Sequence, residues 1–295
     1  MTASATAGPA VAAPPDPQLY KLRDLIYHAA GIFHPDNKLR LLEERCGRRR
    51  EALKIRTLRE YIDRLNHAST GRDEMVKLLN EITIGETCFF RNRAQLDALK
   101  SVILPRILAA RAATAPKNLR LWSAGCSTGE EPYSLAMFLL EECAHLLLGW
   151  TTEIQATDLN EHSLQHAQAG VYADYSVRNV NAQYRQKYFV AVGDKLQLGP
   201  EPRKRVTLSR LNLLDTPRMA LLKNIDVIFC ANVLIYFDLQ SKRKVIDQFH
   251  SCLQPNGYFF LGHSESLFGV TDQFKLVHFP STTGYVKSQL PAAGG

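Results

Sequence analysis

Residues 119–136 read Leu-Arg-Leu-Trp-Ser-Ala-Gly-Cys-Ser-Thr-Gly-Glu-Glu-Pro-Tyr-Ser-Leu-Ala, and this stretch decides the fold of the 295-residue chain. Leu119 and Leu121 alternate with other side chains as in a β-strand, and a turn of small residues follows at 123–129. A helix then begins with Pro132 in its first turn, where the missing N–H of proline has no intrahelical partner to lose. Strand, glycine turn and helix bring a nucleotide to the carboxyl edge of a parallel sheet. We therefore expect an α/β, Rossmann-like domain.

The turn differs from a dinucleotide-binding fingerprint. It lacks a third glycine after Gly125 and Gly129, and two acids, Glu130 and Glu131, stand where a pyrophosphate would bind. Carboxylates suit the positive end of a helix dipole, but they repel phosphate and attract cations. S-adenosylmethionine is a nucleoside that carries a sulfonium and an ammonium group, and it fits this arrangement. The alternative, that the two acids only cap the helix, stays open.

Three further apolar runs complete the expected sheet. The run 152–158 ends on Asp158, 29 residues after Gly129. An acid that closes the second strand of such a fold accepts hydrogen bonds from ribose hydroxyls. The runs 225–230 and 257–262 are typical of buried parallel strands. The pattern predicts a nucleoside site at the carboxyl ends of these strands.

Four motifs occur in order along the chain: Thr87-Cys-Phe-Phe-Arg91, Ser127-Thr-Gly-Glu-Glu-Pro-Tyr-Ser134, Asn232-Val-Leu-Ile-Tyr-Phe237 and Gly262-His-Ser-Glu265. Together they resemble the chemotaxis receptor methyltransferases, the CheR family. The resemblance implies methyl transfer from S-adenosylmethionine to glutamate side chains of a chemoreceptor's cytoplasmic helical bundle, with S-adenosylhomocysteine as product. It also implies an all-α N-terminal domain, a Rossmann-like catalytic domain and a small antiparallel β-subdomain.

The resemblance also implies the site residues. The turn and the family pattern together place the cofactor at Gly85, Thr87, Arg91, Gly125, Glu131, Asp158, Asn212, Leu213, Asn232 and Val233. Arg91 and Tyr236 match positions near the methyl group and are the expected catalytic residues. A glutamate acceptor is already ionised at neutral pH, so no general base is required. Arg91 is expected to orient the acceptor, because a bidentate contact would stabilise its ground state. Tyr236 donates to the second carboxylate oxygen or walls the pocket.

Two positions depart from the family pattern. Gly85 stands where many relatives have Asn, and Ala231 stands where Arg is frequent. Two interpretations of Phe89 and Phe90 stay open: the side chains pack in the core, or they contact the substrate. His162 and His166 are spaced to share a metal ion, but no third ligand is placed, so we expect no metal site.

The domain boundaries follow from composition and periodicity. We expect a disordered tail over 1–17, a helical N-terminal domain over 18–84, a linker with cofactor-site residues over 85–100, and a catalytic domain over 101–290 that carries the β-subdomain at about 171–210. The tail is rich in Ala, Pro, Thr and Ser, so it cannot bury a core. It also lacks the apolar segment of a signal peptide.

Composition restricts the setting. No apolar run is long enough to span a membrane, and the six cysteines show no CxxC spacing, as expected for reduced cytosolic thiols. We therefore expect a cytoplasmic protein without membrane insertion, acting as a monomer. Between Lys21 and Arg64 there are 12 Lys or Arg against 7 Asp or Glu.

That excess of positive charge includes the adjacent residues Arg48, Arg49 and Arg50, which we expect to bind the receptor. A merely solvated helix face is the equal alternative. Nucleic acid is not the expected partner, because neither interleaved aromatic residues nor a zinc pattern accompanies the charge.

Other functions also stay open. Methylation of RNA or of a small acid would use the same fold, since a fold does not determine the acceptor. A cofactor-binding adaptor without catalytic activity is the third possibility. In some family members the β-subdomain binds a short peptide at the receptor's C-terminus by adding a strand. Here Pro200 and Pro202 follow a turn and cannot donate ladder hydrogen bonds, so we expect an enzyme independent of such a tether.

Overall fold

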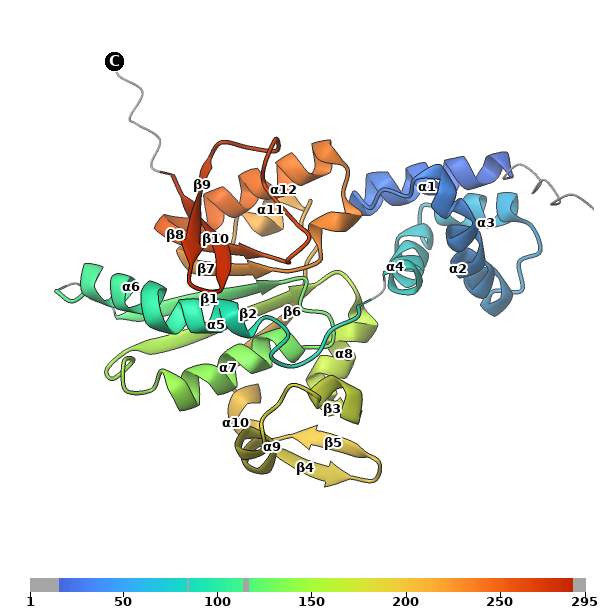
Figure 1. The fold of residues 1–295 in the computed structure, drawn as a ribbon. Coiled ribbons are helices and arrows are strands. Elements are labelled where there is room, and N and C mark those ends of the chain that lie inside the picture. The colour runs from blue at the N-terminus through green and yellow to red at the C-terminus, as the bar shows by residue number, and fades with distance from the viewer. Residues whose placement is uncertain (1–15, 84, 114–116, 289–295) are drawn as a thin grey trace, which may run out of the picture. The chain divides into compact units, whose positions relative to one another are not determined.

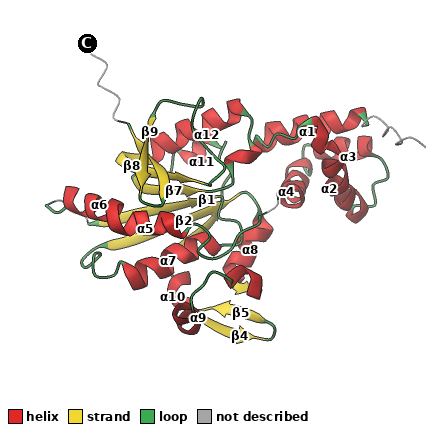
Figure 2. Cartoon of the chain, viewed as in Figure 1, coloured by secondary structure: helices red, strands yellow, loops and turns green. Residues whose placement is uncertain are grey.

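The computed structural model describes residues 16–83, 85–113 and 117–288. The chain divides into an N-terminal unit, which ends at Ile82 and leaves out residues 30–32, and a larger unit formed by those three residues together with Thr83 onward. Figure 1 labels the elements, and Figure 2 shows helices in the first unit and a mixture of strands and helices in the second. The tail expected over 1–17 lies outside the described residues except for Asp16 and Pro17, which begins a helix.

The N-terminal unit is helical, as expected. Its helices are α1 (Pro17–Ala30), α2 (Leu39–Ala52), α3 (Leu58–Leu65) and α4 (Gly71–Ile82). A capping box begins α3, because the Glu60 backbone N–H donates to Thr57 Oγ1 at 3.2 Å and the Thr57 N–H donates to Glu60 Oε2 at 3.0 Å. Leu19, Leu22 and Ile26, which recur at helical spacing, are fully buried.

A seven-stranded sheet forms the centre of the larger unit. Its strands are β1 (Asn118–Ala124), β2 (Thr151–Asp158), β6 (Val206–Arg210), β7 (Ile225–Cys230), β8 (Leu253–Leu261), β9 (Phe274–Phe279) and β10 (Thr282–Lys287), in the order β6-β2-β1-β7-β8-β10-β9. The first five in this order run parallel, and β10 and β9 pair antiparallel at one edge. The chain order reverses between β1 and β7, so the expected ligand position lies at the carboxyl ends of these strands.

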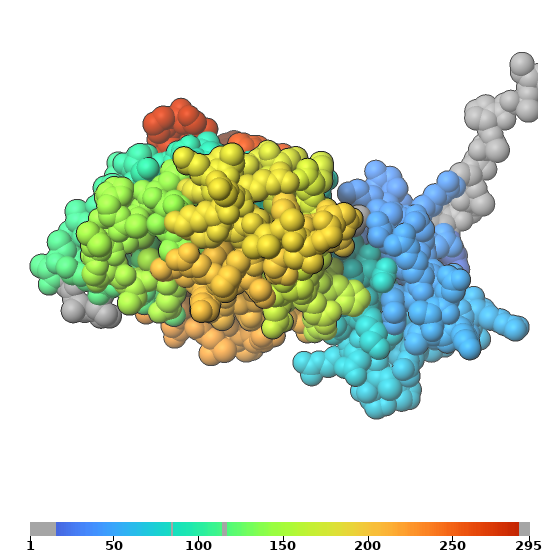
Figure 3. All heavy atoms as spheres, turned by 90° about the horizontal axis from the view of Figure 1, so that it is seen from below, coloured from blue at the N-terminus to red at the C-terminus, as the bar shows by residue number. Residues whose placement is uncertain are grey.

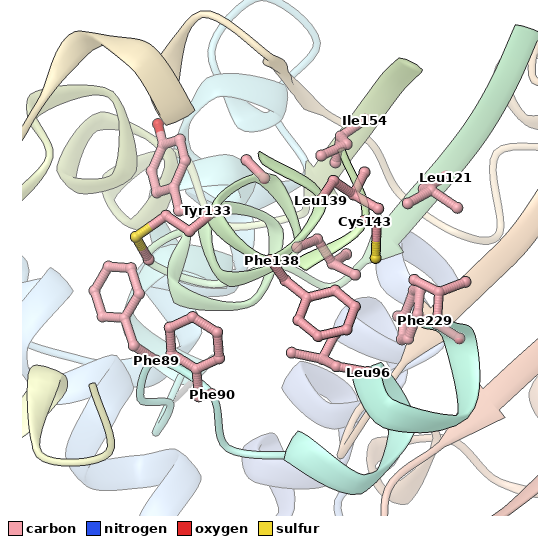
Figure 4. Packing of buried hydrophobic residues seen from close by; sticks show 14 of the residues in the cluster. Phe89, Phe90, Leu96, Leu121, Tyr133, Phe138, Leu139, Cys143, Ile154 and Phe229 are labelled. Carbon is pink, nitrogen blue, oxygen red and sulfur yellow. The ribbon is translucent and has the colours of Figure 1, made fainter. Parts of the chain in front are cut away.

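Helices cover both faces of this sheet, because successive side chains of a strand point to opposite faces. Leu119 and Leu121 of β1 belong to the core that includes side chains of α5 (Arg93–Ala98), the π-helical turn Leu99–Ile103, α6 (Leu104–Ala110) and α7 (Glu130–Glu142). Figure 4 shows this packing around Phe138 and Phe229. Trp122 of β1 lies in the opposite core, where its ring meets that of Phe249 of α12 (Leu239–Cys252) edge to face. Two further helices, α8 (Glu161–Ala169) and α11 (Thr216–Met219), follow β2 and β6.

A small antiparallel sheet follows α8. It has the order β3-β5-β4 and contains β3 (Val171–Tyr172), β4 (Phe189–Val192) and β5 (Lys195–Leu198), with α9 (Ala182–Tyr188) before β4 and α10 (Pro200–Arg203) after β5. Its residues form a continuous layer on the face shown in Figure 3. The expected range of about 171–210 extends too far, because β6 pairs with β2 in the large sheet.

The segment expected as a linker over 85–100 is partly core. Phe89 packs edge to face on Tyr172 and Phe189, with ring centroids 4.8 and 5.2 Å apart, and Phe90 packs on Tyr184 at 5.3 Å. Phe89 therefore anchors the chain against the small sheet and Phe90 anchors it against α9, and the burial of both side chains favours core packing over contact with the substrate. The segment then continues directly into α5. None of the helices in the described ranges combines the length and apolar character that a bilayer span requires.

Candidate active site

The glycine turn follows β1 and connects three strands of the sheet. The backbone N–H groups of Gly125 and Cys126 donate to the carbonyl oxygen of Thr157 at 2.8 and 2.9 Å. Gly125 has φ of 80°, and a Cβ there would lie 2.3 Å from Cγ2 of Val233. Only glycine allows this conformation and this approach. The turn therefore brings Gly125 and Val233, two of the expected cofactor residues, into contact.

Asp158 ends β2, as the sequence predicts, and holds the turn from the other side. Its Oδ2 accepts the Ser127 N–H at 2.8 Å and its Oδ1 accepts the Asn160 N–H at 2.8 Å. Burial raises the pKa of Asp158, although backbone hydrogen bonds from Asn160, Ser127 and Leu159 act against the shift. A carboxylate oxygen can accept more than one hydrogen bond, so the buried Asp158 side chain retains capacity for further donors. Such a group fits the two hydroxyls of a ribose.

The strand end next to Asp158 carries two more expected residues. The Leu211 N–H donates to the Asp158 carbonyl oxygen at 2.9 Å, so Asn212 and Leu213 follow directly at the same edge. The carbonyl oxygen of Leu213 accepts from Gln248 Nε2 of α12 at 2.7 Å, which fixes the backbone there. β6 itself ends at Arg210, just before Asn212 and Leu213.

The two acids at the start of α7 have different surroundings. Glu130 is only 2% exposed and accepts the Thr128 hydroxyl at 2.6 Å. Glu131 instead accepts the hydroxyl of Ser123, at the end of β1, at 2.7 Å. Only Glu131 therefore belongs to the edge where the cofactor is expected.

Burial raises the pKa of Glu131 to about 7, and the charge of Glu265 adds to the shift. The Ser123 hydroxyl and the positive charge of Arg91 oppose it. A nearby cation would stabilise a buried carboxyl group of this kind as the carboxylate, because an opposite charge favours the ionised form. This property fits the ammonium of S-adenosylmethionine and goes beyond what capping a helix requires.

Arg91 and Tyr236 lie at the same edge. The Arg91 side chain is exposed, and its Nη1 donates to the Glu86 carbonyl oxygen at 2.7 Å. Tyr236 ends the short turn Leu234–Tyr236 and is 39% exposed. Burial raises the pKa of Tyr236, Glu265 adds to the shift, and Arg91 opposes it. An acceptor from solution can therefore reach both side chains.

The remaining expected residues lie in loops. Thr87 is half-buried just before the anchored Phe89. Gly85 lies against the glycine turn, since a Cβ on it would be 2.0 Å from Oγ of Ser127. Asn232 has a positive φ of 61° after β7.

One acid was missed by the sequence analysis. Oε2 of Glu265 accepts the Asn232 N–H at 2.6 Å. Glu265 belongs to the Gly-His-Ser-Glu motif, which was recognised from the sequence without a role for its acid.

The three arginines of α2 have different environments within the N-terminal unit. Arg49 donates through Nε and Nη2 to Glu74 at 3.0 and 2.9 Å, and the Tyr61 hydroxyl donates to the same carboxylate at 2.8 Å. Arg48 is exposed and pairs with Glu44 at 3.4 Å. Nη1 of Arg50 donates to the Arg56 carbonyl oxygen at 3.0 Å. Arg49 is thus part of the interior of the unit, unlike the exposed Arg48.

Comparison with protein families matches both units. The model described as "CheR methyltransferase, SAM binding domain" matches residues 85–283, and the model described as "CheR methyltransferase, all-alpha domain" matches residues 17–83. The chain belongs to the CheR methyltransferase family. It is an S-adenosylmethionine-dependent methyltransferase, and several of its relatives are named chemotaxis protein methyltransferases.

Relatives of this CheR methyltransferase resemble it over most of their length. It is 36% identical over 273 residues to chemotaxis protein methyltransferase 2 of Vibrio cholerae serotype O1, covering 92% of this chain and 93% of the relative. It is 36% identical over 260 residues to chemotaxis protein methyltransferase 1 of Pseudomonas aeruginosa, covering 86% and 92%. A solved structure of the N-methyltransferase NodS from Bradyrhizobium japonicum WM9 with S-adenosyl-l-homocysteine matches with a TM-score of 0.38 at 14% identity, covering 77% of this chain and 96% of that one.

Proposed function

We propose that this methyltransferase methylates glutamate side chains on the cytoplasmic helical bundle of a chemoreceptor and so forms glutamyl methyl esters for sensory adaptation. The observation that carries the proposal is the edge where Glu131 and Asp158 lie beside the accessible side chains of Arg91 and Tyr236. The names of these relatives, chemotaxis protein methyltransferases, support the setting. We further propose that the enzyme acts in the cytoplasm as a monomer.

The residues present fit the cofactor. Glu131 would hold the ammonium group, and Asp158 would accept from the ribose. Gly125 lets the backbone approach closely, and the other expected residues, Gly85, Thr87, Asn212, Leu213, Asn232 and Val233, would line the site. Bound S-adenosylmethionine supplies an electrophilic methyl group.

The side chains then have little chemistry to perform. The acceptor carboxylate is ionised at neutral pH and needs no base. Tyr236 has a raised pKa, so its hydroxyl stays protonated and can donate to the acceptor oxygen that does not react. Arg91 would orient the same carboxylate from solution. Alignment of the acceptor and removal of its water would supply most of the rate.

The nature of the bond formed tests the function. The enzyme, a cell lysate that contains receptors and RNA, and S-adenosylmethionine with a radioactive methyl group are incubated together and then treated with mild alkali. A glutamyl methyl ester releases volatile radioactive methanol, whereas a methyl group on nitrogen or carbon stays bound. Labelled RNA would support the RNA alternative, and binding of cofactor without any transfer would support the adaptor.

Substitutions at Arg91 and Tyr236 test their placement. Tyr236→Phe removes one hydrogen bond to the acceptor and should lower kcat by about tenfold, with cofactor affinity nearly unchanged. Arg91→Ala should also lower turnover more than cofactor affinity. The measurements are initial rates with a receptor fragment and calorimetry with S-adenosylhomocysteine. Full initial rates in either variant would show that the residue is misplaced.

A further inference from the structure

Glu265 connects the loop after β7 with the end of β8. Its Oε2 accepts two backbone N–H groups, from Asn232 at 2.6 Å and from Gly262 at 2.9 Å. Its Oε1 accepts the N–H of Ile235 at 3.3 Å. The Glu265 N–H in turn donates to the Gly262 carbonyl oxygen at 3.0 Å. One carboxylate thus binds the backbone at three places.

The backbone around this carboxylate is shaped for it. Asn232 has a φ of 61°, a left-handed conformation that persists in a non-glycine residue when its surroundings hold it. A Cβ on Gly262 would lie 2.8 Å from Oε2 of Glu265 and 3.0 Å from the Asn232 nitrogen. Glycine at position 262 is therefore needed for the carboxylate to reach both strand ends.

Ile235 lies in the middle of the turn Leu234–Tyr236, which also presents Tyr236. Within this turn the Tyr236 N–H donates to the Val233 carbonyl oxygen at 3.2 Å. The Ile235 N–H comes before the first N–H that is bonded within the turn, so it has no partner inside the turn, as at any helix start. Oε1 of Glu265 accepts from this N–H and so holds the backbone that carries Tyr236.

We propose that Glu265 is a positioning residue for Tyr236: its Oε2 joins the ends of β7 and β8, and its Oε1 sets the turn that places the phenol at the acceptor. The proposal rests on the proposed function only for the role of Tyr236. The two oxygens have separate tasks, so a substitution can affect one task and spare the other.

Glu265→Gln makes this separation. The amide oxygen can occupy the position of Oε2 and keep the N–H groups of Asn232 and Gly262, and the amide NH₂ then faces the Ile235 N–H and cannot accept from it. Glu265→Ala removes all three contacts. Glu153→Gln is a matched control, because Glu153 is a carboxylate that accepts hydrogen bonds from Asn118 and Arg120 near the amino ends of β1 and β2.

Amide hydrogen exchange, measured without cofactor or acceptor, reports directly on the hydrogen bonds from backbone N–H groups to Glu265. In Glu265→Gln the Ile235 amide should exchange at least severalfold faster than in the unsubstituted protein, and the Asn232 amide should keep its rate. The Glu153→Gln control should leave both rates unchanged. Unchanged exchange at Ile235 in Glu265→Gln would overturn the proposal whether or not the acceptor is a receptor glutamate.

Steady-state kinetics measure the effect of Glu265 on turnover. Glu265→Gln should lower kcat by about as much as Tyr236→Phe, with less than a twofold change in the Kd for S-adenosylhomocysteine and in the KM for the receptor fragment. Adding Glu265→Gln to Tyr236→Phe should lower kcat little further, because both act through the same phenol. Full turnover in Glu265→Gln, or equal losses of cofactor affinity and turnover, would overturn the proposal.

Discussion

We expect the carboxyl group of Glu131 to make cofactor binding depend on pH. Its pKa is about 7, raised from 4.5 mainly by burial, so between these values the folded apoprotein binds more protons there than the unfolded chain. The contribution of Glu131 to stability therefore falls as pH rises from 4.5 to 7. A cation beside Glu131 stabilises the ionised form, so cofactor affinity should change in the opposite direction.

We expect S-adenosylmethionine to bind about eightfold more tightly at pH 7.5 than at pH 6, the ratio of ionised fractions for a group with a pKa near 7. Over this range an α-amino group keeps most of its proton. Calorimetry across the range measures the effect. Glu131→Gln is the control, and it should bind more weakly at pH 7.5 with little pH dependence. An equally steep profile in the variant would assign the titration to another group.

Gly85, one of the two departures from the family pattern, forms a packed pair with Ser127. A Cβ on Gly85 would meet Ser127 Oγ at 2.0 Å and Ser127 Cβ at 3.0 Å. Gly85→Ala should therefore displace the glycine turn at a cost of about 1–3 kcal/mol, as overpacking usually does. Part of this cost should be recovered in Gly85→Ala combined with Ser127→Ala, because the hydroxyl is removed. Thermal unfolding of the two single variants and the double variant measures the coupling, and strict additivity would show that the two residues do not meet.

Helix α2 carries the basic residues expected to bind the receptor, but only part of that set can do so. Arg49 and Glu74 are an internal ion pair with 16% and 3% of their side-chain surfaces exposed. Reversing the charge of all three arginines would therefore disrupt the N-terminal unit and would not test binding. Arg49→Met leaves the Glu74 charge buried and should destabilise the protein by about 3 kcal/mol.

The receptor surface is tested with Arg48→Glu and Arg50→Glu combined. This variant should raise the KM for a receptor fragment and weaken the dependence of KM on salt, with kcat nearly unchanged. Lys204→Glu combined with Arg205→Glu is the matched control, because it makes the same change in net charge at exposed residues of the larger unit. If both double variants shift KM equally, overall charge is responsible, and α2 is only a solvated helix face.

The expectation that no peptide tether binds the small sheet rests on Pro200 and Pro202, and the structure contradicts that argument. Pro200 and Pro202 lie in α10 and do not flank a ladder, so they leave the outer edge of β4 open. Val190 and Val192 on this edge are 66% and 52% exposed. What still argues against a strong tether is length, since β4 has four residues.

A strand added to β4 would gain two to four ladder bonds of about 1 kcal/mol each, which corresponds to a millimolar Kd at best. We therefore expect a pentapeptide from a receptor C-terminus to bind with a Kd in the millimolar range. Fluorescence anisotropy of the labelled peptide checks this, with a scrambled peptide as control. Specific binding in the micromolar range would mean that side chains of the small sheet contribute far more than its backbone.

Across the whole molecule, the features that can be predicted from the sequence are those that depend on residues close together in the chain. The strands that end near Ala124, Asp158 and Cys230, the turn at Gly125 and the acid at Asp158 follow from short-range periodicity and from residue types that a nucleoside site needs. The separation of Glu130 from Glu131, the internal position of Arg49 and the role of Glu265 depend on partners far away in sequence. Such partners, Glu74 for Arg49 and Asn232 for Glu265, become visible only when the chain is folded.

The burial of every cysteine has a practical consequence. All six thiols are free and buried, and burial raises the pKa of Cys46 and of Cys143 to about 12, so the native protein should resist alkylation. Cys46 lies in the N-terminal unit, and the other five lie in the larger one. The number of thiols labelled by a brief pulse of a thiol reagent during slow denaturation therefore identifies the unit that has opened. One added mass marks opening of the N-terminal unit alone, and five mark loss of the larger unit, so a single mass spectrum reports which unit unfolds first.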